Sequence, residues 1–431
     1  MMKGTRSQAA SPSAKAPAVA ALPLHHSSLA SLARRASRRL WDLDEEKLCA
    51  EAQRRTGLAK FGDPPLQPAL SILLNSLEQE ADLHPLGRLL MRIHLRGLLE
   101  TRLRLAEAWR GKREALDARA IEKPIFVVGT PRSGSTFLHE LMAEDPAHRA
   151  PRVWEVMFPI AAARAQERDR KRRIRRAETC LWWFRRLAPG ADAVYPMRAR
   201  TPHECVAIHS YTFLSEEFVS TCRVPTYEAF LKSADLNPAY LWQKRFLQHL
   251  DLECPGPRWV LKSPDHVCGL EELFSVFPDA RIVHTHRNPV EVLKSSAELT
   301  RVLRGLYGPA GDLEETRAQE ARTLAERTER FLQFRDLHPE LAHRFVDVNY
   351  PGLVANPMAT MRRIYEQLDT PLTKAVAEGM QRLAATRSRY RGRRASSEPS
   401  GLNLESSTEA VVFKRYCSRF GLSYQEEAVG S

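Results

Sequence analysis

The chain has 431 residues, of which 43% are hydrophobic, and its formal net charge is +13 at pH 7. No apolar run approaches the roughly 18 residues of a membrane-spanning helix, which argues against a membrane-embedded protein. The 7 cysteines are scattered and form no Cys-x-x-Cys pair, which argues against a disulfide framework and against a structural zinc site.

The N-terminal part divides into a tail and a helical segment. Residues 1–38 are rich in Ala, Ser, Pro and basic side chains without any acidic one, and predict a disordered basic tail with at most weak helicity. Residues 39–122 place apolar side chains at helical spacing and predict a helical N-terminal extension. The main domain is expected over residues 123–431. We expect a cytoplasmic protein, with organellar targeting by the basic N-terminus as the alternative.

Short apolar runs alternate with helical patterns along the main domain. The predicted strands are Pro124–Gly129, Arg258–Lys262, Arg281–Thr285 and Arg344–Val348. The predicted helices are Phe137–Glu144, His266–Phe277, Asn288–Leu303, Leu313–Leu337 and Pro357–Leu368. Strands that alternate with helices of this length predict an α/β fold with a P-loop-like parallel sheet flanked by helices.

A dense arginine run lies between the first two strands, from Arg164 to Arg186, and ends near the apolar cluster Leu181–Phe184. Such a run is most often the solvated face of a helix. A surface that binds an acidic substrate or a membrane is the alternative.

The stretch Gly129–Thr136 follows the first strand and has the spacing of a phosphate loop. Ser135 occupies the position where nucleotide triphosphatases have a lysine. Backbone N–H groups at a helix N-terminus still favour an anion, and Arg132 brings a positive charge into the loop. The loop therefore predicts phosphate binding and argues against hydrolysis of ATP or GTP.

Further polar side chains follow the other predicted strands. Ligands of open parallel sheets bind beyond the carboxyl ends of the strands, where this chain has Lys262, Arg287 and Tyr350. Ser295 lies on the second turn of the helix after Arg287, so a guanidinium and a hydroxyl can hold one phosphate from two sides. This edge of the sheet therefore suits an anionic ligand.

Three of these stretches, Pro131–Thr136, Val260–Pro264 and His286–Ser295, together resemble the sulfotransferases that use 3′-phosphoadenosine 5′-phosphosulfate (PAPS). The resemblance is to the bacterial-type branch, and Val348–Pro357 is similar to the corresponding stretch of the protein-tyrosine sulfotransferases. It covers roughly residues 123–386.

The resemblance implies a role for each candidate residue. The residues that would hold the 5′-phosphosulfate are Arg132, Ser133, Gly134, Ser135 and Thr136. Arg287 and Ser295 would bind the 3′-phosphate, and Tyr350 would lie against the nucleotide. Lys262 would stabilise the bridging oxygen as the S–O bond breaks, together with Arg132 at the leaving phosphate.

The acceptor hydroxyl needs a base. The resemblance implies Glu155 for this role, and a carboxylate beside apolar residues has a raised pKa that suits proton transfer. Glu204 and His203 stand side by side at an expected helix start and are the alternatives.

These observations predict a sulfotransferase that moves a sulfonate from PAPS to a hydroxyl, or to an amine, by in-line transfer without a metal ion. The acceptor is a small molecule, lipid, glycan or peptide. The alternatives are a P-loop nucleotide kinase or NTPase and a basic nucleic-acid-binding protein that uses residues 164–186. We expect no nucleic-acid partner and no transmembrane segment, and the oligomeric state is left open.

Overall fold

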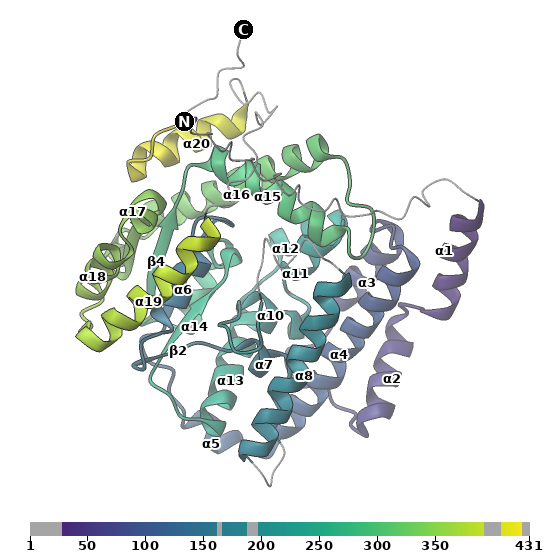
Figure 1. Cartoon of the computed structure of the whole chain (residues 1–431). Helices are drawn as coiled ribbons and strands as arrows, with labels where there is room; N and C mark the ends of the chain where they lie inside the picture. Colours follow the sequence, from purple (N-terminus) through teal and green to yellow (C-terminus); the bar gives the residue numbers. More distant parts are fainter. Residues whose placement is uncertain (1–27, 162–165, 188–196, 392–406, 425–431) are drawn as a thin grey trace, which may run out of the picture.

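Five parallel strands form the central sheet of the computed structural model, in the order β2-β3-β1-β4-β5 (Figure 1). The structure describes residues 28–161, 166–187, 197–391 and 407–424. The strands are β1 (Ile125–Gly129), β2 (His148–Arg149), β3 (Arg258–Lys262), β4 (Arg281–His286) and β5 (Phe345–Asn349). The four predicted strands are confirmed to within about one residue at each end. The very short β2 was predicted as loop, and prolines at positions 146 and 151 flank it closely.

Alternate residues of β1 face two different layers of helices, which explains why the whole strand is buried. Ile125 and Val127 pack against α6 and α17–α19, whereas Phe126 and Val128 belong to a larger core with the remaining helices. The first layer consists of α6 (Ser135–Met142), α17 (Tyr350–Ala355), α18 (Pro357–Gln367) and α19 (Lys374–Arg391). The predicted parallel sheet with helices on both faces is confirmed.

The second layer and the elements around it supply most of the remaining chain. Before β3 they are α7 (Val153–Met157), α8 (Gln166–Leu187), α10 (Val206–His209), η1 (Ser210–Thr212), α11 (Glu217–Thr221), α12 (Pro225–Ser233) and α13 (Asn237–Glu253). After β3 they are η2 (Pro264–Cys268), α14 (Leu270–Val276), α15 (Pro289–Arg304), α16 (Leu313–Leu337), η3 (Pro339–Arg344) and α20 (Thr408–Phe420). Within the described ranges, no helix has both the length and the apolar character needed to cross a membrane.

The predicted N-terminal helical extension packs into the same core as the sheet. It consists of α1 (Ser28–Leu40), α2 (Glu45–Thr56), α3 (Ala69–Gln79), α4 (Pro85–Arg110) and α5 (Arg113–Asp117). On α4, Arg102 is fully buried, donates from Nη1 to the Tyr211 carbonyl at 2.7 Å and lies 4.7 Å from the centroid of the Trp242 ring. Because a buried guanidinium needs such partners, this contact fixes α4 against η1 and α13.

Helix α1 corrects part of the prediction for the N-terminal tail. Residues 28–38, expected to be disordered or weakly helical, belong to this helix. Arg34 Nη1 pairs with Asp82 Oδ1 at 2.5 Å, and Arg38 Nη2 donates to the Glu78 carbonyl at 3.2 Å. These contacts with the end of α3 and the turn after it give α1 partners that composition alone does not reveal. The rest of the predicted tail lies outside the described residues.

Candidate active site

The predicted phosphate loop connects β1 to α6 and is held from behind by buried contacts. Ser133 is fully buried, and its Oγ donates to the Thr130 carbonyl at 2.6 Å and lies 2.7 Å from Thr285 Oγ1 on β4. The helix begins after Gly134, which has no side chain to cap the first N–H groups. Ser133 therefore supports the loop, and the first turn of α6 is the part that can receive a phosphate.

Gly134 has a left-handed backbone with φ +88°, and a Cβ at this position would lie 2.8 Å from Tyr350 Cδ2. We expect Gly134→Ala to weaken binding of 3′,5′-adenosine bisphosphate (PAP) about 10-fold in calorimetry, because an alanine in this conformation costs about 1–2 kcal/mol. Gly352→Ala on α17 is the control, since a Cβ there meets nothing within 4 Å. An equal loss of affinity in both variants would contradict this explanation.

One contact group lies at the ends of β1, β4 and β5. It consists of Arg132, Arg287, Ser295 and Tyr350. Arg132 Nε donates to Ser295 Oγ at 2.8 Å, and Arg287 Nη1 donates to the Arg132 carbonyl at 2.8 Å. The Arg287 guanidinium also lies 4.3 Å from the centroid of the Tyr350 ring and donates from Nε to Glu291 Oε2 at 2.9 Å. The structure thus joins the phosphate loop to the predicted 3′-phosphate residues.

The two arginines of this group affect each other electrostatically. Desolvation and then the positive charge of Arg287 lower the pKa of Arg132 from its ordinary value of 12.5. The Arg132 guanidinium stays charged at neutral pH, because even a lowered arginine pKa lies far above 7. Because like charges held this close repel, an anion that lies between them is stabilised.

Lys262 ends β3 and is almost fully buried, with 3% of its surface exposed. Its Nζ donates to Glu204 Oε1 at 2.5 Å and to Thr136 Oγ1 at 3.2 Å. The Cys205 N–H donates to the Lys262 carbonyl at 2.9 Å, which holds this segment at the end of β3. A buried lysine requires such a charge partner. The structure therefore brings together Lys262, the phosphate-loop helix and Glu204.

Glu155 is also buried, but its partners lie elsewhere. Its Oε2 accepts the Arg152 N–H at 2.8 Å in a capping box at the start of α7. Its Oε1 lies 3.4 Å from Arg149 Nη2, and Arg149 also pairs with Asp251 at 2.8 Å. These contacts tie Glu155 to α7 and β2 rather than to Lys262.

His203 precedes Glu204 and is the third base candidate. Its backbone N–H donates to the Pro151 carbonyl at 2.8 Å. Burial lowers the pKa of its imidazole, and Nδ1 has no hydrogen-bond partner among the described residues. The side chain is therefore neutral at physiological pH and packs without a contact to Lys262 that would orient it.

Sequence reasoning missed the contribution of α20 to this edge of the sheet, where Figure 1 shows it beyond the end of β4. Tyr416 Oη lies 2.8 Å from His286 Nδ1, and the Phe420 ring stacks on His286 with centroids 3.8 Å apart. Asn349 Nδ2 donates to the Phe420 carbonyl at 3.2 Å. The helical spacing of the aromatic residues Phe413, Tyr416 and Phe420 is the sequence signal that could have revealed this helix.

Behind this edge, the ligand atoms of His284, His286 and Asp347 lie within 4.8 Å of one another, the only described group that could hold a metal ion. Asp347 already accepts hydrogen bonds from Arg335 at 3.1 and 3.2 Å and lies 2.9 Å from His286 Nε2. These bonds outweigh the effect of burial and hold the pKa of Asp347 below its ordinary value of 3.8. An internal hydrogen-bond network accounts for His286 and Asp347, whereas His284 Nδ1 is buried without a hydrogen-bond partner among the described residues. The prediction of a reaction without metal stays a prediction.

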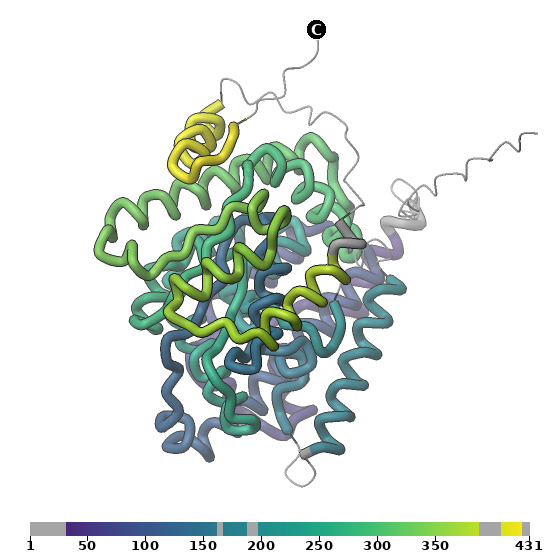
Figure 2. Tube along the Cα trace, turned by 60° about the vertical axis from the view of Figure 1, so that its left-hand side comes forward, coloured from purple at the N-terminus to yellow at the C-terminus, as the bar shows by residue number. Residues whose placement is uncertain are grey.

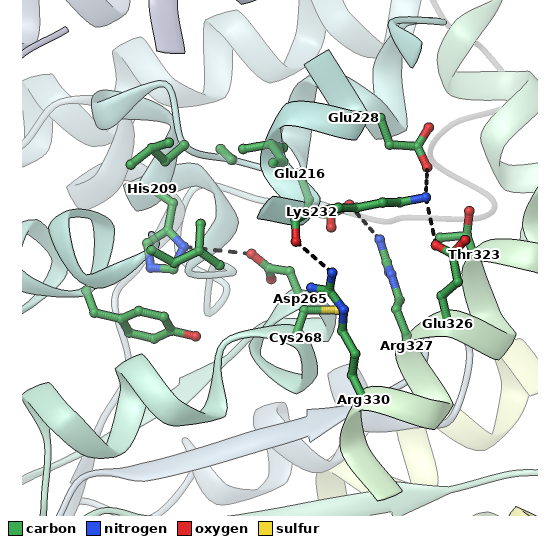
Figure 3. Close-up of a pocket in the computed structure, with 15 residues that line it drawn as sticks. His209, Glu216, Glu228, Lys232, Asp265, Cys268, Thr323, Glu326, Arg327 and Arg330 are labelled. Carbon is green, nitrogen blue, oxygen red and sulfur yellow. Dashed lines mark hydrogen bonds and ion pairs between the residues drawn. The ribbon is translucent and has the colours of Figure 1, made fainter. Parts of the chain in front are cut away.

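A cavity of about 50 Å³ lies beside Asp265, between η2, α12 and α16 (Figure 3). Its walls are charged, but the charges are paired: Arg327 binds Glu216 at 2.5 Å and Lys232 binds Glu326 at 2.7 Å. The volume admits one or a few water molecules. The cavity is therefore too small for a nucleotide.

His139 of α6 supplies a test of the buried surroundings of the loop. It is 2% exposed, and burial lowers its pKa from 6.5 to about 3. The unfolded chain binds a proton below about pH 6.5 that the folded chain does not bind, so stability falls as the pH decreases. Between about pH 7 and about pH 5, denaturant unfolding should show the wild type losing about 2 kcal/mol more than His139→Gln. Equal losses would mean that His139 binds a proton as readily in the folded state as in the unfolded chain.

Comparison with known proteins points to one family. A model of the sulfotransferase family matches residues 124–374. Among curated proteins, the omega-hydroxy-beta-dihydromenaquinone-9 sulfotransferases Stf3 of Mycobacterium tuberculosis and Mycobacterium bovis are 25% identical over 269 residues. The match covers 57% of this chain and only 63% of the length of those relatives.

Two solved structures share most of the fold. The sulfotransferase STF1 from Mycobacterium tuberculosis superposes with a TM-score of 0.70 at 30% identity, covering 81% of this chain and 98% of the other. The sulfotransferase STF9 from Mycobacterium avium superposes with a TM-score of 0.76 at 27% identity, covering 89% and 98%. Both superpositions extend beyond the family region, because residues 124–374 make up a smaller share of this chain than the 81% and 89% that they cover.

Proposed function

Because the chain belongs to the sulfotransferase family, we propose that it transfers a sulfonate group from PAPS to a hydroxyl of its acceptor, or less favourably to an amine. The observation that carries this proposal is the contact of Arg132 with Ser295 at 2.8 Å. It connects a phosphate loop without lysine to a second cluster of anion-binding groups. A donor with separate 5′ and 3′ phosphates suits two such clusters better than a nucleoside triphosphate does.

In this proposal the donor lies along the carboxyl edge of the sheet. The first turn of α6, from Ser135 on, and the Arg132 guanidinium bind the 5′-phosphosulfate. Arg287 and Ser295 bind the 3′-phosphate, and the Tyr350 ring lies against the nucleotide. Ser133 contributes by supporting the loop, because its side chain is committed to contacts behind it.

The proposed chemistry is a direct in-line displacement. The acceptor oxygen attacks sulfur, the bond from sulfur to the 5′-phosphate oxygen breaks, and PAP leaves. Negative charge develops on the leaving oxygen, where Lys262 and Arg132 stabilise it. In phosphoryl transfer a bound magnesium ion performs much of this task. Here the protein's own cations can do so.

We propose Glu204 as the base that accepts the proton of the acceptor. Its carboxylate lies 2.5 Å from Lys262 Nζ, the group assigned to the leaving oxygen. Glu155, the first candidate from the sequence, is engaged instead with the N-cap of α7 and with Arg149. A general base must first lie within reach of the proton that it accepts, so these contacts favour Glu204 over Glu155.

For the acceptor we propose a lipid or small-molecule hydroxyl. The curated relatives carry a name that specifies a hydroxylated menaquinone lipid as their substrate. The chain matches 63% of their length at 25% identity. We therefore infer the class of acceptor from these relatives, and not the particular compound.

The function is tested by incubating the protein with sulfur-labelled PAPS and hydroxylated lipids, phenols, glycans and peptides. We expect label in at least one acceptor and PAP as the second product. Magnesium-dependent turnover of ATP, with no label transferred and no PAP bound, would reject the proposal in favour of a P-loop NTPase.

A further inference from the structure

Helix α8 presents a single stripe of arginine and tryptophan side chains to solvent. Its exposed side chains at spacings of three, four and seven residues share one side of the helix. The stripe consists of Arg168, Arg172, Arg175, Thr179, Trp182, Trp183 and Arg186. It contains no acidic residue, and Lys171 and Arg176 are exposed on its flanks.

The opposite face of α8 is fixed to the protein, so the stripe cannot turn inward. Ile174 and Ala177 are buried against Trp154 of α7. Arg173 is buried beside them and pairs with Glu253 of α13 at 2.9 Å. Figures 1 and 2 both show α8 along the outside of the molecule.

Trp182 and Trp183 are the most unusual members of the stripe. They are 45% and 55% exposed, respectively, although large aromatic side chains are mostly buried in folded proteins. Their rings contact each other at 4.8 Å with an interplanar angle of 80°, and Arg186 lies 5.2 Å from the Trp182 ring. Among the described residues, Arg168, Arg175 and Arg186 form no ion pair with a carboxylate.

We infer that the α8 stripe docks the protein on the surface of an anionic lipid bilayer. Guanidinium groups pair with lipid phosphates, and indole rings prefer the boundary between head groups and acyl chains. The helix is roughly 30 Å long and straight enough to meet a flat surface with both groups at once. A single-stranded nucleic acid would need separate stacking platforms, which two rings packed edge to face do not offer.

The stripe also lies near the chain segment that leads to the site. Glu178 of α8 accepts the Ala199 N–H at 2.8 Å, and Arg185 donates to the Met197 carbonyl at 3.3 Å. This segment continues to Glu204. The docking itself does not depend on the proposed reaction.

The charge of the stripe is tested by co-sedimentation with phosphatidylcholine vesicles that contain about 30 mol% phosphatidylglycerol. We expect the wild type to bind these vesicles and to bind pure phosphatidylcholine much more weakly. R168E/R175E/R186E should lower the affinity at least about 100-fold, since each charge contributes roughly fivefold. The matched control R54E/R362E/K374E changes the same number of exposed charges on α2, α18 and α19 and should bind nearly as the wild type does.

The tryptophans are tested separately with W182S/W183S and brominated lipids. Quenching of tryptophan fluorescence should largely disappear in this variant, and its vesicle affinity should fall about 10-fold. Equal loss in the stripe and control triple variants, or equal binding to neutral and anionic vesicles, would overturn the inference. So would stripe-dependent binding of single-stranded RNA without vesicle binding. PAP affinity is measured in each variant as a separate readout of the donor site. A protein that binds vesicles but not PAP would contradict only the proposed function.

Discussion

Replacing both Arg132 and Arg287 with alanine is expected to weaken PAP binding at least about 100-fold. Each guanidinium that binds a phosphate contributes roughly 1.5–3 kcal/mol, and the two are proposed to hold different phosphates of one ligand. The change should appear as loss of the calorimetric isotherm with little change in thermal stability, because neither side chain belongs to the buried core.

The two single variants separate the contributions of Arg287 and Arg132 to PAP binding. Arg287→Ala should remove most of the preference for PAP over adenosine 5′-diphosphate, because only PAP has a 3′-phosphate. Arg132→Ala should weaken both ligands. A matched control is R54A/R362A, which removes two exposed arginines on α2 and α18. If the control pair lost as much affinity as Arg132→Ala/Arg287→Ala, a general effect of charge would explain the binding.

Glu204→Gln is expected to lower kcat at least about 100-fold while PAP affinity changes little. The variant keeps the shape of the side chain but cannot accept a proton, and general base catalysis contributes 100-fold or more. Single-turnover measurement of label transfer from PAPS separates this chemical step from binding and release.

Glu155→Gln provides the comparison for this experiment. It weakens the capping box of α7 and the pair with Arg149, so we expect about 1 kcal/mol less stability and nearly normal kcat. The reverse outcome, with turnover abolished in Glu155→Gln and retained in Glu204→Gln, would return the base to Glu155.

The sheet could be predicted because its signals are local. Each strand is a short apolar run followed by a turn or a helix start, and α16 begins and ends at the predicted residues Leu313 and Leu337. Helix α1 was missed because its stability comes from contacts with Asp82 and Glu78 rather than from its own composition. Contacts with the rest of the protein, more than helix propensity, therefore explain why α1 forms.

The site residues that directly follow strands could be predicted. Those on a segment far away in the sequence that packs against the sheet could be predicted less well. Arg132, Lys262 and Arg287 lie at strand ends, so parallel topology was enough to place them on one edge. The choice between Glu155 and Glu204 depends on which segment lies against β3. The hydrogen bond from the Cys205 N–H to the Lys262 carbonyl decides this, and no sequence spacing encodes it.

The proposed function depends most on a donor that is recognised through two separate phosphates. Calorimetric titration of the wild-type protein with PAP and with adenosine 5′-diphosphate tests this directly, since both ligands carry two phosphates and only PAP carries one of them on the 3′ oxygen. We predict that PAP binds at least about 10-fold more tightly, and that Arg287→Ala abolishes most of this difference. Equal affinity for the two nucleotides in the wild type would contradict the account.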